Sequence, residues 1–203
     1  MHIAVTGNIG AGKTTLAKKL AEHYGWEVMY EAVEGNPYLA DFYGNMERWS
    51  FNLQMYFLKS RFEQVMEIKD SNKKIIQDRT IYEDAYIFAK NLKESGKMSA
   101  VDYETYFGLF SLMMKVVKAP DLMIYLKADL PKLVKQIKKR GRDFEAGISE
   151  EYLSNLNEHY RFFTENYKVG TLLVIDVNEL DYVNKTGDFE FIIQKVDKAL
   201  LFA

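Results

Sequence analysis

Residues 7–14 of the chain are Gly7-Asn8-Ile9-Gly10-Ala11-Gly12-Lys13-Thr14, which matches the pattern GxxxxGKS/T. The apolar, β-branched residues 2–6 come directly before this stretch, and residues 15–21 follow it with apolar side chains at helical spacing. A glycine-rich loop between a strand and a helix is the context in which this pattern binds phosphate. The stretch therefore predicts a phosphate-binding P-loop; the alternative is a glycine-rich turn that binds nothing.

Each part of this loop has a chemical task. Gly7 and Gly12 let backbone N–H groups turn inward without a Cβ clash, and these groups form an anion site with the N-terminus of the following helix. The Lys13 ammonium is expected to reach the outer phosphates, and the Thr14 hydroxyl to hold Mg²⁺. The residues of the loop expected to bind the nucleotide are Gly7, Asn8, Gly10, Ala11, Gly12, Lys13, Thr14 and Thr15.

Length and composition narrow the class of protein. The 203 residues are 48% hydrophobic and 28% charged, which fits one globular domain over residues 1–203 with a sizeable core. The net charge of −2 gives no electrostatic footprint for nucleic acid. The chain has no cysteine, which excludes disulfides and fits a reducing cytoplasm. We expect no signal peptide and no membrane-spanning segment, and therefore a cytoplasmic location without a membrane partner.

Short apolar runs alternate with longer helical patterns along the chain, which is typical of a parallel sheet with crossover helices. The predicted strands cover residues 2–6, 27–30, 74–77, 122–126 and 172–176. The predicted helices cover residues 14–24, 37–43, 46–69, 82–94, 99–117, 130–139, 149–167 and 188–201. We therefore expect an α/β fold with a five-stranded parallel sheet and helices on both faces. In such sheets ligands bind at the carboxyl ends of the strands.

Polar side chains stand at the ends of two predicted strands. Glu31 follows the second strand, where a carboxylate beside phosphates could accept a proton from an attacking hydroxyl. A helix cap or a surface charge is an equally good interpretation of its position. Asp78 and Arg79 end the third strand; the acid is typical of a magnesium-organising carboxylate, and the arginine can stabilise phosphoryl charge or merely pair with an acid.

Two predicted helices carry polar residues beside apolar stripes. Gln54 and Arg61 are seven residues apart and share one face of the helix over residues 46–69. The Gln54 amide is both donor and acceptor, which suits the edge of a nucleobase, although two solvated polar residues would show the same spacing. Asp84 and Phe88 share a face of the next helix, where Phe88 could stack on a base or belong to the core.

Two further stretches suggest a dimer face and a lid. The predicted helix over residues 99–117 is apolar over a broad surface, which indicates core contacts plus a dimer face. Arg140 and Arg142 flank Gly141 after another helix, which suggests a mobile lid that closes on phosphates. A basic solvated turn is the alternative for this segment.

Taken together, these stretches resemble the deoxynucleoside kinases, the family of deoxycytidine, deoxyguanosine and deoxyadenosine kinases, over nearly the whole chain. The matching motifs are GNIGAGKTT at 7–15, YEAVEGNPYLADFY at 30–43, ERWSFNLQMYFLKSR at 47–61, DRTIYEDAYIFA at 78–89, KKRGRDFEAGI at 138–148 and DVNELDY at 176–182. The resemblance implies a P-loop kinase fold with an arginine-containing lid at about 138–148. It also implies phosphoryl transfer from ATP, with Mg²⁺, to the 5′-hydroxyl of a deoxynucleoside, and a homodimer through the helices near 46–69 and 99–117.

The resemblance implies catalytic and ATP-binding roles residue by residue. Glu31 is similar to the general base for the 5′-hydroxyl, and Arg79 to the arginine near that hydroxyl and the transferred phosphoryl group; Lys13 completes the catalytic set. Arg140 and Arg142 resemble the lid arginines that join the P-loop in binding ATP. Asp78 resembles the acid of the arginine's motif, so that Thr14 and Asp78 are the residues expected at the metal.

The resemblance also assigns the nucleoside site. Gln54 resembles the glutamine that reads the base, Phe88 the aromatic ring stacked on it, and the remaining pairs either hold the sugar or line the far edge of the base. Tyr43 and Glu145 are similar to the pair that holds the 3′-hydroxyl. Arg61 and Asp84 resemble the pair found in members that accept purine deoxynucleosides and deoxycytidine. The residues expected to bind the nucleoside are Glu31, Tyr43, Gln54, Arg61, Arg79, Asp84, Phe88 and Glu145.

Two departures from the family pattern concern a phosphate contact and the substrate. Gln136 stands where the family often has a further arginine before the lid. Asn36-Pro37 stands where animal members carry a tryptophan, which resembles the bacterial deoxyadenosine/deoxyguanosine kinase branch and favours deoxyadenosine. A purine deoxynucleoside with deoxyadenosine preferred, and thymidine poor, is therefore the expected substrate range.

Two rival functions fit the P-loop but not its surroundings. A nucleoside monophosphate kinase of the thymidylate kinase type wants a cation near the end of the second strand, where this chain has Glu31, which would repel a monophosphate. A regulatory GTPase needs the motif NKxD, and the nearest string, residues 184–187, places Gly187 where the acid should be.

Overall fold

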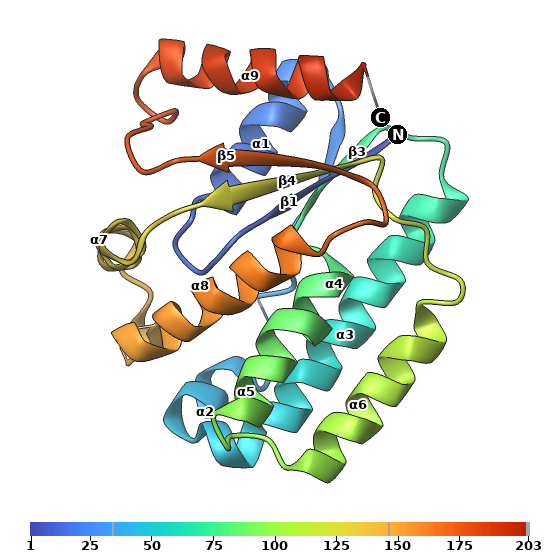
Figure 1. The fold of residues 1–203 in the computed structure, drawn as a ribbon, viewed down its shortest axis with the longest axis vertical. Helices are drawn as coiled ribbons and strands as arrows, with labels where there is room; N and C mark the ends of the chain where they lie inside the picture. Colours follow the sequence, from blue (N-terminus) through green and yellow to red (C-terminus); the bar gives the residue numbers. More distant parts are fainter. Residues whose placement is uncertain (34, 146, 202–203) are drawn as a thin grey trace.

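The computed structural model describes residues 1–33, 35–145 and 147–201. Its strands form one sheet of five parallel strands in the order β2-β3-β1-β4-β5 (Figure 1), which confirms the predicted sheet. The strands are β1 (His2–Thr6), β2 (Glu27–Met29), β3 (Ile75–Asp78), β4 (Leu122–Lys127) and β5 (Thr171–Asp176). β3 extends one residue beyond the prediction because Asp78 pairs in register with Val5 of β1.

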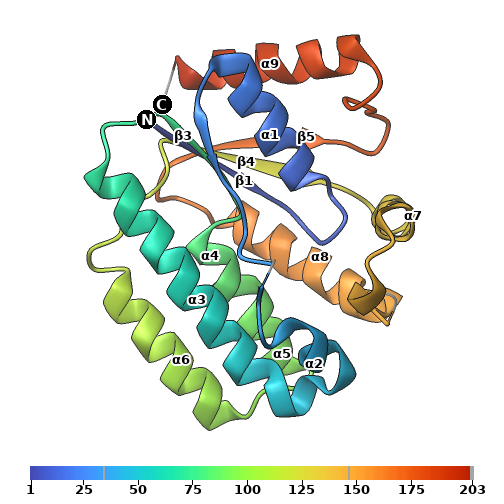
Figure 2. The same ribbon diagram turned by 180° about the vertical axis from the view of Figure 1, so that it is seen from behind.

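Helices cover both faces of the sheet, as the alternation in the sequence predicts. Figures 1 and 2 show α1 and α9 on one face and the helices from α3 to α6, with α8, on the other. The longer helices are α1 (Lys13–Tyr24), α3 (Met46–Asp70), α6 (Ala100–Met113), α7 (Leu130–Arg140), α8 (Glu150–Glu165) and α9 (Thr186–Leu200). The shorter ones are α2 (Leu39–Gly44), α4 (Ile81–Glu83), α5 (Lys90–Glu94) and the 3₁₀ turn η2 (Asp143–Glu145).

The side chains of β4 alternate between the two faces and are apolar on both. Leu122, Ile124 and Leu126 pack in the cluster formed with α1 and α9, while Met123 and Tyr125 join the clusters on the other face. A parallel strand in the middle of such a sheet is buried on both sides, so a continuous apolar run is expected there.

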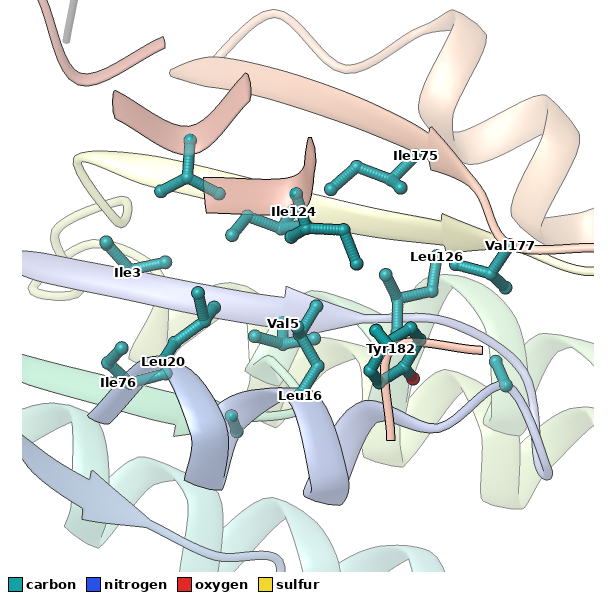
Figure 3. Packing of buried hydrophobic residues seen from close by; sticks show 14 of the residues in the cluster. Ile3, Val5, Leu16, Leu20, Ile76, Ile124, Leu126, Ile175, Val177 and Tyr182 are labelled. Atoms are coloured by element: carbon teal, nitrogen blue, oxygen red, sulfur yellow. The ribbon is translucent and has the colours of Figure 1, made fainter. Parts of the chain in front are cut away.

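The core between the sheet, α1 and α9 holds the first strand and the first helix together (Figure 3). Leu16 and Leu20 of α1 lie one helical turn apart and are fully buried beside Ile3 and Val5 of β1. Burial of a leucine side chain contributes about 1.5–3 kcal/mol. The loop between β1 and α1 is therefore fixed at both ends.

The helix predicted over residues 82–94 is present over residues 81–94, but its middle is not α-helical. The structure has α4, then a π-helical segment η1 (Asp84–Ala89), then α5. The wider π turn lets Asp84 and Phe88 line one cavity while Ala85 and Ala89 remain in the core. Such π segments often occur at functional sites, and apolar spacing alone does not reveal them.

Candidate active site

The P-loop lies between β1 and α1, where two glycines are required by its surroundings. A Cβ atom on Gly12 would lie 2.1 Å from the hydroxyl of Tyr182, which donates a hydrogen bond of 3.1 Å to the Gly12 carbonyl. Gly12 also has a φ of 95°, in the left-handed region that favours glycine. A Cβ on Gly7 would lie 2.9 Å from the carbonyl oxygen of Leu126. Only glycine therefore fits at these two positions of the loop.

The loop is also tied to α8. The Asn8 side-chain amide donates to the carbonyl oxygen of Leu153 at 2.9 Å and to Oδ1 of Asn157 at 2.7 Å. The Asn8 Oδ1 atom in turn accepts from the backbone N–H of Ile9 at 2.7 Å. Asn8, which the motif leaves unspecified, thus connects the loop to a helix from the last quarter of the chain.

Lys13 begins α1 and lies almost fully buried under the loop. Its ammonium donates to the carbonyl oxygen of Asn8 at 3.1 Å. Burial and the neighbouring Arg79 lower the pKa of Lys13 to about 8, although Asp78 acts in the opposite direction. A buried cation at the N-terminus of a helix is poised to gain from an incoming phosphate, which would restore its charged state.

Thr14 and Asp78 meet at the carboxyl end of the sheet. The Thr14 hydroxyl donates to Asp78 Oδ2 at 2.5 Å, and Asp78 Oδ1 is buried without a hydrogen-bond partner among the described residues. Burial raises the pKa of Asp78 against the opposing effect of Lys13. Hydroxyl and carboxylate oxygens are the donors that Mg²⁺ prefers, so this pair fits the ion. In the described part of the chain no group of three or more His, Cys, Asp or Glu side chains could hold a metal.

A cavity of about 410 Å³ opens beside the P-loop. It lies at the carboxyl ends of the strands, where ligands bind in open α/β sheets. It is lined by Ile9, Lys13, Thr14, Tyr30, Glu31, Ala32, Val33, Leu39, Phe42, Tyr43, Leu53, Gln54, Phe57, Asp78, Arg79, Asp84, Phe88, Arg140, Arg142, Phe144, Glu145 and Tyr152. Every residue predicted to bind the nucleoside therefore lines this cavity except Arg61, which is buried and does not line it.

Glu31 faces the cavity and is held by two arginines. Its Oε1 lies 2.7 Å from Arg79 Nε and 3.4 Å from Arg61 Nη2. Burial alone would raise the pKa of Glu31, but the guanidinium groups of Arg79 and Arg61 bring it below its ordinary value. Glu31 is therefore ionised at neutral pH and can accept a proton.

Arg79 has the only positive φ, 74°, among the described residues other than glycine. The left-handed region costs such a residue roughly 1–2 kcal/mol, and strain of this kind concentrates at functional sites. The Arg79 N–H donates to the carbonyl oxygen of Val5 at 2.9 Å, and its guanidinium carbon lies 4.4 Å from the centroid of the Phe88 ring. Burial alone would lower the pKa of Arg79, but Glu31 and other neighbours raise it well above its usual value.

The deep end of the cavity has buried polar atoms that lack partners. Arg61 Nε and Asp84 Oδ2 are 3.5 Å apart, which makes an ion pair but no hydrogen bond. Both atoms, and Gln54 Oε1, have no hydrogen-bond partner among the described residues. Burial raises the pKa of Asp84 to about 7, against the opposing effect of Arg61. Buried polar groups left open in this way indicate a ligand that supplies the missing partners.

Arg61 has a second set of contacts that its spacing in the sequence does not show. Its Nη1 donates to the carbonyl oxygen of Asp78 at 2.9 Å. Since Nη2 also approaches Glu31, the Arg61 side chain contacts Asp84, Glu31 and the end of β3. Arg61 therefore supports several residues around the cavity as well as pairing with Asp84.

The arginines of the segment predicted as a lid form ion pairs with Glu145. Arg140 makes a double contact with Glu145, from Nη2 to Oε1 at 2.6 Å and from Nε to Oε2 at 3.0 Å. Arg142 Nη1 lies 3.4 Å from the same carboxylate. Of the expected range 138–148, residues 138–140 belong to α7, Gly141 ends that helix, and residue 146 lies outside the described residues. Residue 34 of the motif at 30–43 also lies outside them.

Several residues in or near the cavity were not predicted from the sequence. Tyr152 enters the cavity from the first turn of α8, and Phe144 stacks on Tyr43 with ring centroids 5.9 Å apart. Glu83 and Tyr160 form a fully buried contact beneath the loop. The spacing Thr80-x-x-Glu83 is a capping-box pattern, which could have identified Glu83 as a structural residue.

Three comparisons bear on the identity of this site. The family model described as Deoxynucleoside kinase matches residues 3–201. A deoxyadenosine/deoxycytidine kinase of Bacillus subtilis is 38% identical over 196 residues, covering 96% of this chain and 90% of that protein. A deoxyguanosine kinase of the same organism is 36% identical over 207 residues, covering 98% and 97%.

A solved structure extends the likeness to the fold. It is that of deoxyadenosine kinase from M. mycoides, described with the products dCMP and a flexible dCDP bound. Its TM-score is 0.86 at 34% identity, with 98% of this chain and 100% of the other covered. No described helix of the present chain is both long and apolar enough to cross a membrane.

Proposed function

This chain belongs to the deoxynucleoside kinase family and is an ATP-dependent phosphotransferase, and we propose that its preferred acceptor is the 5′-hydroxyl of deoxyadenosine. The observation that carries the proposal is the pair of buried, unpartnered acceptor oxygens, Gln54 Oε1 and Asp84 Oδ2. The amino group of adenine or cytosine can donate to these oxygens. The carbonyl of guanine or thymine can be met only by turning the Gln54 amide, so Asp84 with Arg61 decides against thymine, whose methyl group lies in that region. Purines reach further toward Asp84, and Asn36-Pro37 supports the bacterial purine branch.

Two of the cavity residues supply the chemistry in this proposal. Ionised Glu31 accepts the proton of the 5′-hydroxyl as the oxygen attacks the terminal phosphorus of ATP. Arg79, which contacts Glu31 directly, stabilises the charge that develops on the transferred phosphoryl group. The P-loop N–H groups and Lys13 bind the phosphates and align them with the attacking oxygen.

Thr14 and Asp78 are the residues we propose to hold Mg²⁺ with ATP. Their contact and the free Asp78 Oδ1 support this assignment. Because the protein offers so few oxygen ligands there, phosphate oxygens and water would complete the coordination, which is the usual arrangement for this ion. When bound, the ion supplies charge neutralisation on the phosphates.

We further propose that the segment from Arg140 to Glu145 exchanges partners when substrates bind. Glu145 is nearly fully buried and turns to the 3′-hydroxyl together with Tyr43, while Arg140 and Arg142 turn to the phosphates. The present ion pairs hold these charges in place until the substrates arrive. This exchange makes closure dependent on both substrates.

A homodimer through α3 and α6 is also part of the proposal. Val101 and Leu112 of α6 are 72% and 59% exposed, although the helix is apolar over most of its length. Covering these side chains in a dimer removes apolar surface from water. Light scattering at micromolar concentration tests the assembly, and a monomer there contradicts it.

The decisive test of function is a panel of the four deoxynucleosides and dTMP with ATP and Mg²⁺. We expect turnover to be highest with deoxyadenosine, lower with deoxycytidine and deoxyguanosine, poor with thymidine, and absent with dTMP. Glu31→Gln should retain ATP binding but lose about a hundred- to ten-thousand-fold in kcat. Near-normal kcat in that variant would remove Glu31 from the role of base, and consumption of ATP with dTMP would support a monophosphate kinase instead.

A further inference from the structure

Glu83 is a fully buried carboxylate outside the cavity, and each of its two oxygens has a different set of contacts. Oε2 accepts from the backbone N–H of Thr80 at 2.7 Å, as part of the capping box that begins α4. Oε1 accepts from the backbone N–H of Gly7 at 3.4 Å and lies 3.6 Å from Arg79 Nη1. One carboxylate therefore touches the first glycine of the P-loop and the arginine that ends β3.

Tyr160 of α8 completes this contact from the opposite side. Its hydroxyl oxygen lies 2.6 Å from Glu83 Oε1 and 2.8 Å from the carbonyl oxygen of Gly7, so its one proton can be donated to either acceptor. It also accepts from Arg79 Nη1 at 3.4 Å. Tyr160 is fully buried, and its ring stacks on that of Tyr125 with centroids 5.6 Å apart. The hydroxyl is thus held at a fixed point between the loop and the arginine.

Glu83 and Tyr160 restrain parts of Arg79 and its backbone that Glu31 does not contact. The Arg79 N–H is fixed by Val5, and the next N–H, that of Thr80, is fixed by Glu83. These two bonds bracket the residue that has the left-handed φ. At the other end of the side chain, Nη1 faces Glu83 and Tyr160 while Nε faces Glu31. Backbone and guanidinium are therefore both oriented by groups that do not reach the cavity.

We propose that Glu83 and Tyr160 are positioning residues for phosphoryl transfer, which set the distance and angle between the P-loop at Gly7 and the guanidinium of Arg79. Neither side chain lines the cavity, so they act through the residues that do. Phosphoryl transfer depends on alignment, and a displacement of about 1 Å can lower a rate roughly a hundredfold. This inference rests on the catalytic role proposed for Arg79.

Tyr160→Phe and Glu83→Gln test the inference with little change in shape. The glutamine amide oxygen can still accept from Thr80, which preserves the start of α4, but its NH₂ group then faces the donors on Gly7 and Arg79. We expect each variant to lose about 10- to 100-fold in kcat, with the KM values for ATP and deoxynucleoside changed much less. The double variant should lose little more than the worse single variant, because both changes release the same restraint.

Tyr125→Phe is the matched control. Tyr125 is buried beside Tyr160, has a ring of the same kind, and makes no hydrogen bond through its hydroxyl to any described residue. The Tyr125→Phe variant should therefore keep the parent kcat. Rates are normalised to folded protein, measured by near-UV circular dichroism, so that a loss of stability is not counted as a loss of turnover. If Glu83→Gln does not fold, Tyr160→Phe with this control decides the matter alone.

The outcomes separate this inference from the proposed function. Normal kcat in Tyr160→Phe, or an equal loss in Tyr125→Phe, overturns the positioning role. Arg79→Lys is measured in parallel: if it retains the parent kcat, the proposed role of Arg79 is wrong. If Arg79→Lys is impaired while Tyr160→Phe and Glu83→Gln are normal, only the positioning role is wrong.

Discussion

Replacing Asp84 by asparagine should weaken the discrimination between deoxyadenosine and thymidine. The change keeps the size of the side chain but turns an acceptor into a group that can also donate. In the parent protein the carbonyl of thymine would leave the buried Asp84 Oδ2 without a donor, since this oxygen already lacks a hydrogen-bond partner, whereas the Gln54 amide can turn to donate to that carbonyl. An unsatisfied buried group costs about 1–3 kcal/mol, which corresponds to about 5- to 150-fold in kcat/KM.

The ratio of kcat/KM for thymidine to that for deoxyadenosine is the quantity to measure. We expect it to rise by about 5- to 150-fold in Asp84→Asn. The double change Arg61→Met with Asp84→Ala should raise the same ratio, but it should also lower kcat with every nucleoside, because Arg61 contacts Glu31 and the Asp78 carbonyl. The ratio cancels that common loss.

The assay is best run at pH 8, with saturating ATP. Burial raises the pKa of Asp84 to about 7, so the carboxyl is mostly ionised at pH 8 and accepts only. As the pH falls below 7 the protonated carboxyl can donate, and the parent should discriminate less, whereas Asp84→Asn should show no such trend. Asp121→Asn serves as the control, since Asp121 binds the His2 N–H and does not line the large cavity. A thymidine ratio unchanged in Asp84→Asn, or efficient thymidine phosphorylation by the parent, would refute the argument.

Three further predictions concern binding, turnover and stability. Because the pKa of Lys13 is lowered to about 8 and a phosphate restores its charge, the Kd of ATP should rise about tenfold per pH unit above 8 in titration calorimetry. Arg142→Ala should lower kcat more than it raises the nucleoside KM, and Arg140→Ala should do the same while freeing Glu145. Burial lowers the pKa of His2 to about 4, so its stability contribution is complete above pH 6.5 and falls by about 3 kcal/mol toward pH 4 in urea titrations.

Each of these predictions can fail clearly. An ATP Kd that is flat between pH 7.5 and 9.5 would show that Lys13 is charged throughout. An effect of Arg142→Ala confined to nucleoside affinity would place that arginine outside the phosphate site. For His2, the variant His2→Phe should lack its part of the pH dependence, and an identical slope in the variant and the parent would assign the effect to other groups.

The sequence predicted the parts of the fold that depend on local pattern. The P-loop follows from the motif at residues 7–14. The order of strands and helices and the parallel sheet follow from apolar spacing, because a strand buried on both faces and an amphipathic helix each have a characteristic pattern. The π segment at Asp84–Ala89 could not be predicted in this way. Its extra residue per turn is stabilised by tertiary packing around Ala85 and Ala89, which apolar spacing in one sequence does not encode.

The sequence predicted which residues line the cavity better than it predicted the contacts between their side chains. Gln54, Glu31 and Asp84 line one cavity, as expected from the strand end and the helix faces on which the sequence places them. The double role of Arg61 and the ion pairs of Glu145 depend on distances across the fold. Glu83 and Tyr160 are 77 positions apart and show no shared pattern, so their contact is visible only in three dimensions.

The hydrogen bond from Tyr182 to Gly12 sets a condition on when the nucleotide site can exist during synthesis. The loop leaves the ribosome well before the residues that hold it, which are Tyr182 and residues of α8. At 5–20 residues per second, roughly 10 to 30 seconds separate Thr14 from Tyr182. During that interval the nascent chain has a complete P-loop sequence without its full set of supports. Chains halted before Tyr182 should therefore not be retained on immobilised ATP.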